Sequence, residues 1–169
     1  MTRAPTMTAA CACGRVELEA FGRPIISAVC YCDDCRKAAD LIEALPGAGA
    51  VRDPDGGTAY VLFRKDRIAC SKGADLLTPF KLKDTSLANR VVAACCLSAM
   101  LMNFDRGPFW VSAYRARFAG DLPPLQARIC TKFKADGVVL ADDVPSSRGY
   151  PPALIARLLA SRLAMALGR

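Results

Sequence analysis

The chain has 169 residues, 53% of them hydrophobic, and a formal net charge of +7. This length indicates one domain that can bury its own core, and the composition excludes global disorder. No apolar run is long enough to cross a bilayer and residues 1–10 lack the apolar segment of a signal peptide, so we expect a cytoplasmic protein without a membrane span.

The elements expected along the chain are mostly strands. Residues 1–10 are expected to form a flexible tail. Hydrophobic alternation and turn signals predict strands at 15–20, 25–29, 58–63, 67–70, 76–82, 90–95 and 109–118. Residues 34–45 favour a helix with Asp33 or Asp34 as N-cap and Pro46-Gly47 as its stop. Residues 121–145 are expected to be irregular, and 152–167 to form an amphipathic helix.

The C-terminal part combines an apolar helical stripe with a basic charge balance. The stripe consists of Leu154, Ile155, Leu158, Leu159, Leu163 and Leu167. Packing on the body or in a homo-oligomer is favoured over a membrane-surface helix. From Arg115 onward nine Lys/Arg oppose four Asp, which makes nucleic acid a candidate partner. The low aromatic content, 7%, and the lack of a nucleic-acid motif argue against it.

Nine cysteines and no histidine make thiolate–metal binding the main candidate chemistry. The odd count and the short spacings favour metal sites over a disulfide framework. The clusters are a C-x-C pair, a C-x-C-x-x-C motif and an adjacent pair: Cys11 and Cys13; Cys30, Cys32 and Cys35; Cys95 and Cys96. Because such spacings bring sulfurs together, we expect one or two Zn²⁺ ions on these seven cysteines. Cys70 and Cys130 stand alone and are expected to be buried structural thiols.

These motifs resemble the glutathione-dependent formaldehyde-activating enzyme and centromere protein V domain family. Cys11-Ala-Cys13-Gly14 and Cys30-Tyr-Cys32-Asp-Asp-Cys35-Arg36-Lys37 match the first two family motifs, within a resemblance that spans about 10–118. It implies a mainly β fold, the β-tent, built around zinc–cysteine knuckles, with a short helix after C-x-C-x-x-C. The organisation would be a tail at 1–10, a zinc-binding domain at 11–118 and an extension at 119–169 that ends in a helix.

The resemblance also implies the division of the cysteines between two zinc ions. Cys30, Cys32 and Cys35 would hold one zinc with an open position. Cys11 and Cys13 would join a late C-x-x-C pair around a second, structural zinc.

The third family motif is altered in this chain. With Arg90 set on the family arginine, Ala93 stands in place of the first late cysteine, Cys96 matches the second, and Leu97 replaces a glycine. Cys95 can supply the ligand that is missing at Ala93 only if the strand bends. Adjacent residues in a regular strand face opposite sides, so Cys95 and Cys96 could not otherwise reach the same zinc. The second site is thus three-cysteine, rearranged or empty.

Two other segments bear on the place of the chain in the family. Ala38-Ala39-Asp40 replaces the Ser-Gly pair that often follows C-R-K. The residues around Asp55-Gly-Gly57, Ala69-Cys70 and Ala94-Cys95-Cys96 resemble an uncharacterised bacterial branch of the family.

With such an open zinc, the resemblance implies carbon–sulfur lyase activity on S-hydroxymethyl-glutathione-type adducts, with a small thiol such as glutathione, or its adduct, bound at the open position. Asp33 and Asp34 are candidates for proton transfer or for helix capping. Arg36 and Lys37 are candidates for binding a substrate carboxylate or for a solvated face. Two further functions stay open: a non-catalytic zinc-stabilised binding module and a redox or metal sensor.

Overall fold

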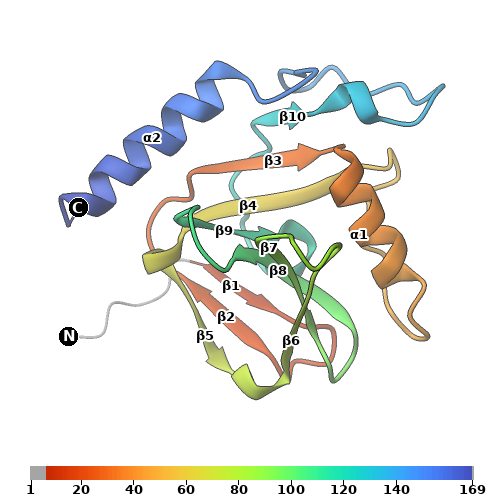
Figure 1. Ribbon diagram of the computed structural model, residues 1–169, viewed down its shortest axis with the longest axis vertical. Coiled ribbons are helices and arrows are strands. Elements are labelled where there is room, and N and C mark those ends of the chain that lie inside the picture. The colour runs from red at the N-terminus through yellow and green to blue at the C-terminus, as the bar shows by residue number, and fades with distance from the viewer. Residues whose placement is uncertain (1–6, 169) are drawn as a thin grey trace.

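The computed structural model describes residues 7–168 and consists mainly of β-strands (Figure 1). The first sheet contains β1 (Met7–Ala10), β2 (Glu17–Ala20) and β5 (Ile68–Lys72). The second contains β3 (Ile26–Cys30), β4 (Thr58–Arg64), β6 (Leu77–Phe80), β7 (Ala88–Ala93), β8 (Ser98–Phe104), β9 (Trp110–Tyr114) and β10 (Ala127–Ile129). Two α-helices, α1 (Asp33–Glu43) and α2 (Pro152–Ala166), complete the fold. The expected mainly β class, with one helix at the cysteine motif and one at the C-terminus, is confirmed.

The strand order places segments that are far apart in sequence side by side. The orders are β1-β2-β5 in the three-stranded sheet and β10-β3-β4-β9-β8-β7-β6 in the seven-stranded sheet. β10 runs parallel to β3, with Ile129 opposite Cys30, whereas the other named pairs are antiparallel. The segment after residue 118 therefore contributes a strand directly beside the C-x-C-x-x-C motif.

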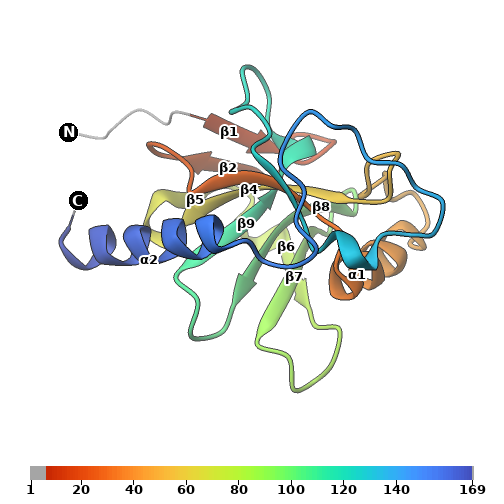
Figure 2. The same cartoon turned by 90° about the horizontal axis from the view of Figure 1, so that it is seen from above.

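The seven-stranded sheet contributes to two hydrophobic cores. One core joins it to the three-stranded sheet, and its members Leu18, Phe63 and Met100 are at most 1% exposed. The other core includes Ile42 of α1 and Leu154 of α2. Full burial of such a side chain contributes roughly 1.5–3 kcal/mol. The two helices lie toward opposite ends of the molecule in both views (Figures 1 and 2).

Three strands were not expected from the sequence. Residues 7–10 form β1 rather than a tail, while residues 1–6 lie outside the described part of the chain. β8 follows the adjacent cysteines, and β10 lies in the stretch expected to be irregular. β1 and β10 are only four and three residues long, so their pairing partners, and not a local pattern, determine them.

The start of α1 corrects the expected capping. The helix begins at Asp33, inside the motif, and its N-cap residue is Cys32, with no side-chain capping hydrogen bond. Asp33 and Asp34 instead occupy the first turn, where a carboxylate is favoured by the helix dipole. The helix ends at Glu43 with Ala44 as C-cap, before Pro46.

α2 buries only part of its apolar stripe. Leu154 is 3% exposed and Leu158 packs against the same core, whereas Leu159 and Leu163 are 66% and 61% exposed. The helix thus contacts the body through residues one turn apart near its start. Within residues 7–168, no helix is both long and apolar enough to span a membrane.

Candidate metal centres and cavity

Four cysteine sulfurs converge where two turns meet. Cys11 and Cys13 follow β1, and Cys95 and Cys96 lie between β7 and β8. All four Sγ atoms lie within 4.8 Å of one another. The Cys11–Cys13, Cys11–Cys95 and Cys13–Cys95 separations are 3.5, 3.8 and 3.4 Å. Thiolates about 2.3 Å from a tetrahedral zinc ion lie roughly 3.8 Å apart, so this set of donors, the four-cysteine cluster, fits the metal.

The β7–β8 turn explains how adjacent cysteines reach one cluster. β7 ends at Ala93, so neither cysteine lies in the strand that the sequence predicts to end at Cys95. The N–H of Leu97 donates to the carbonyl of Ala93 at 2.7 Å and closes the turn. Because turn residues do not alternate between two faces, the Sγ atoms of Cys95 and Cys96 are only 3.9 Å apart. The structure therefore assembles the rearranged alternative, with Cys95 supplying the donor that Ala93 lacks.

Leu97 occupies a strained backbone position in this turn. Its φ of 56° is left-handed, which costs an L-residue roughly 1–2 kcal/mol. Glycine avoids this strain but loses roughly 0.5–1 kcal/mol more on folding. We therefore expect Leu97→Gly to stabilise the protein by about 0.5–1 kcal/mol, measured as a rise in Tm of about 1–4 °C.

Leu87→Gly is the matched control for this prediction. Leu97 is partly buried and Leu87 is 41% exposed, but Leu87 is not among the described residues with positive φ. The same exchange there removes no strain, so the Tm should fall or stay unchanged. Equal Tm changes in the two variants would contradict the assignment of strain to Leu97.

Hydrogen bonds stabilise negative charge on the four-cysteine cluster. The backbone N–H of Val16 donates to Cys11 Sγ at 3.2 Å, and the Ser98 hydroxyl lies 3.2 Å from Cys96 Sγ. Burial opposes ionisation of Cys96, but bonds from Ser98 and from the Cys13 and Ser98 backbones lower its pKa to about 6. Thiolates are the metal-binding form of cysteine, so these contacts favour metal binding.

The second set of sulfurs is built by the junction between β3 and α1. Cys30 ends β3, Cys32 is the N-cap residue of α1, and Cys35 lies in its first turn. Their Sγ atoms lie within 4.8 Å of one another, and no fourth Cys, Asp or Glu of residues 7–168 joins the set. Hydrogen bonds from Cys30 and Cys35 lower the pKa of Cys32, whereas contact with Cys32 raises that of Cys30. One thiolate, that of Cys32, is thus favoured beside two thiols, and the three sulfurs could hold a metal ion.

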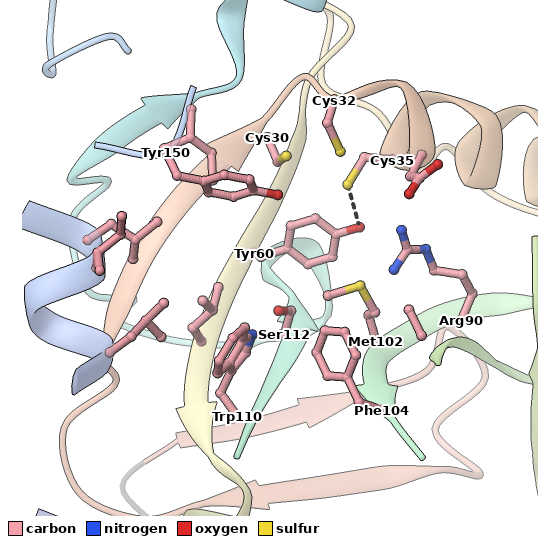
Figure 3. Close-up of a pocket in the computed structure, with 17 residues that line it drawn as sticks. Cys30, Cys32, Cys35, Tyr60, Arg90, Met102, Phe104, Trp110, Ser112 and Tyr150 are labelled. Carbon is pink, nitrogen blue, oxygen red and sulfur yellow. Dashed lines mark hydrogen bonds between the residues drawn. The ribbon is translucent and has the colours of Figure 1, made fainter. Parts of the chain in front are cut away.

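These three thiols line one end of a cavity of about 360 Å³ (Figure 3). Phe104 and Trp110 lie at the end far from the thiols. α2 contributes Leu154, Ile155 and Leu158 to the lining. The volume falls in the range typical of small-molecule sites.

Polar side chains beside the thiols were not identified as site residues from the sequence. The Tyr60 hydroxyl donates to Cys35 Sγ at 3.7 Å, and Arg90 points toward the same region (Figure 3). Burial raises the pKa of Tyr60 well above its ordinary value, so the phenol stays neutral. Ser112 and Tyr150 also line the cavity. One signal was present for Arg90, because it matches the arginine of the third family motif.

The charged residues in and after the C-x-C-x-x-C motif differ in whether they line the cavity. Asp34 lines the cavity. Asp33 Oδ1 instead lies 3.8 Å from Arg36 Nη1, which donates to the Phe133 carbonyl at 2.7 Å. Neither Arg36 nor Lys37 lines the cavity. Of the four candidate polar residues, the structure therefore brings only Asp34 to the cavity.

The two isolated cysteines belong to neither set of sulfurs. Cys70 is partly exposed, and its Sγ donates to the carbonyl of Lys72 at 3.1 Å. Cys130 follows β10 and is 2% exposed. All nine cysteines are free thiols.

The fold and site define a mainly β protein with two cysteine clusters, each able to hold a metal ion. The family model of the glutathione-dependent formaldehyde-activating enzyme matches residues 6–45, which include five of the clustered cysteines. Over this segment the chain is similar to that family. No curated protein matches it. A crystal structure of a Rhodobacter sphaeroides protein is similar, with 19% identity, a TM-score of 0.47 and coverage of 83% of this chain and 99% of its own.

Proposed function

We propose that the protein is a zinc-dependent carbon–sulfur lyase that forms and cleaves adducts of a thiol with an aldehyde. One observation carries this proposal: the sulfurs of Cys30, Cys32 and Cys35 converge at the end of a cavity, and no fourth ligand joins them within residues 7–168. Zinc held there would offer an open position and lower the pKa of a thiol bound to it.

The residues around the thiols suit this chemistry. In the cleavage direction the carbon–sulfur bond of a hydroxymethyl thioether breaks, the hydroxyl proton is lost, and the products are an aldehyde and a thiol. We assign the transfer of this proton, from the hydroxyl oxygen to the sulfur, to the carboxylate of Asp34, which lines the cavity. The neutral Tyr60 hydroxyl fixes Cys35, and the apolar walls limit the access of water.

The proposed role of Asp34 can be tested by the rate of adduct exchange. We expect Asp34→Asn to slow interconversion of formaldehyde and a thiol with its hydroxymethyl adduct by on the order of 10²-fold, because general acid–base catalysis typically contributes that much or more. Exchange NMR on the zinc-loaded protein measures this rate with glutathione and with less polar thiols.

Asp33→Asn is the matched control for Asp34→Asn. Its carboxylate lies in the same helix turn but faces Arg36 and does not line the cavity. The exchange rate should therefore change little. An equal loss in both variants would point to the charge at the start of α1 as the cause and contradict the assignment to Asp34. Absence of acceleration by the zinc-loaded wild type would contradict the lyase proposal itself and favour a binding module.

A further inference from the structure

The chemistry of the cavity walls restricts what can bind beside the three thiols. Most of the lining is apolar, with large side chains contributed by the sheet and by α2: Leu62, Met102, Phe104, Trp110, Leu154 and Leu158. A polar tripeptide such as glutathione carries two carboxylates, an ammonium and two amides, and these walls offer them few partners. Burying such groups without partners is costly. The walls therefore favour a ligand with an apolar body.

One buried cation stands out against this apolar lining. Arg90 is 3% exposed, and its Nε and Nη1 atoms have no hydrogen-bond partner among residues 7–168. A buried donor without a partner costs about 1–3 kcal/mol, and more when it is charged. No carboxylate of the described chain forms a salt bridge with it. Because guanidinium groups remain protonated, this charge and these donors are available to a ligand.

Its position in β7 directs Arg90 toward the cavity. Strand alternation places Ala88 and Arg90 on one face, and both line the cavity. The guanidinium points toward the side of Cys35 and Tyr60 (Figure 3). A ligand that reaches the thiols therefore passes close to a free cation.

We propose that the cavity binds an apolar thiol with a single carboxylate, or its aldehyde adduct, with the sulfur at Cys30, Cys32 and Cys35 and the carboxylate on Arg90. This rests on the lyase function proposed above and names its substrate class. Guanidinium–carboxylate pairs are among the strongest hydrogen-bonded contacts in proteins. The competing explanation is that Arg90 only balances the charge of the metal-bound thiolates. In that case it would strengthen binding of charged and neutral thiols equally.

A pair of ligands with the same shape separates these two explanations. The zinc-loaded protein is titrated with 2-benzyl-3-mercaptopropanoic acid and with its neutral carboxamide. Trp110 is the only tryptophan of the chain and lines the cavity, so its fluorescence reports occupancy without reference to activity. We expect the acid to bind about 10- to 100-fold more tightly than the carboxamide, because a hydrogen-bonded charge pair typically contributes that factor.

Substitution of Arg90 tests where this preference originates. In Arg90→Met the two affinities should agree within about twofold, whereas Arg90→Lys should keep part of the preference because it keeps the charge. Arg106→Met is the control, because Arg106 is exposed and outside the cavity, so its loss changes the net charge alone. It should retain the full preference. Circular dichroism verifies folding, and Arg90→Met should fold because it removes two buried donors, Nε and Nη1, that have no partner among residues 7–168.

The outcomes distinguish this inference from the function on which it rests. Equal binding of acid and carboxamide to the wild type would overturn the inference alone. A preference that persists in Arg90→Met would also overturn it. If neither thiol changes the fluorescence of Trp110, the proposed thiol site fails together with the inference.

Discussion

Replacement of Cys11 by serine is expected to remove one zinc per chain and to unfold the protein or lower its Tm by more than about 10 °C. The physical reason is that the four-cysteine cluster joins segments far apart in the chain, the turn after β1 and the turn after β7. Structural zinc contributes about 10–16 kcal/mol of apparent binding free energy. Whole domains are stable by only about 5–15 kcal/mol. Elemental analysis and thermal unfolding measure the two effects.

Cys70→Ser is the matched control for this loss. Cys70 lies in β5 and belongs to neither cluster, and a serine hydroxyl can replace its hydrogen bond to the Lys72 carbonyl. We expect full zinc content and a Tm within a few degrees of the wild type. If Cys11→Ser kept both the zinc and the Tm, the four-cysteine cluster would not be a structural metal site.

The cavity site should respond differently, because its metal holds a single local segment. We expect Cys32→Ser to lower the zinc content from two ions to one per chain while the fold and the four-cysteine cluster remain. All three donors of this set lie within six residues at one strand–helix junction, so their metal closes no long loop. Zinc analysis, circular dichroism and loss of the thiol-dependent change in Trp110 fluorescence test this outcome.

Cys130→Ala tests whether the fourth ligand position of this zinc site is open or is occupied by Cys130. Cys130 is buried close by, after the strand that pairs with β3, yet its sulfur does not join the three-cysteine set. The variant should keep two zinc ions and should still respond to thiols. Loss of the cavity zinc from Cys130→Ala would identify Cys130 as a fourth ligand. The zinc would then have four protein ligands and no open position, and a non-catalytic binding module would be the better-supported function.

The two cysteine sites differ in how far the sequence could predict them. The spacing of Cys30, Cys32 and Cys35 is local, so a turn between a strand and a helix suffices to bring the sulfurs together. The second site depends on contacts over more than 80 residues, for example between Cys11 and Cys95. Alternation along a strand argued against two adjacent cysteines in one site. The turn from residue 94 to 97 removes that obstacle, and its left-handed position is held by Leu97, where the family motif has a glycine.

Strands with strong alternation, such as β4 and β9, were predictable because their own residues specify a half-buried surface. β1 and β10 were not, since such short segments become strands only when β2 and β3 supply hydrogen-bond partners. The same limit applies to the ends of α1, where Asp33 entered the helix instead of capping it.

The sequence by itself determined the mainly β class, the terminal helix and the grouping of Cys30, Cys32 and Cys35, because hydrophobic period and ligand spacing are properties of neighbouring residues. Tertiary structure alone decided that Cys95 completes the second cluster and that Asp34 and not Asp33 lines the cavity. It also decided that Arg90 is buried beside the thiols with two of its donors lacking a partner among residues 7–168. These features depend on which distant strands pair and on how α2 covers the sheet, and a short-range pattern carries no information about either.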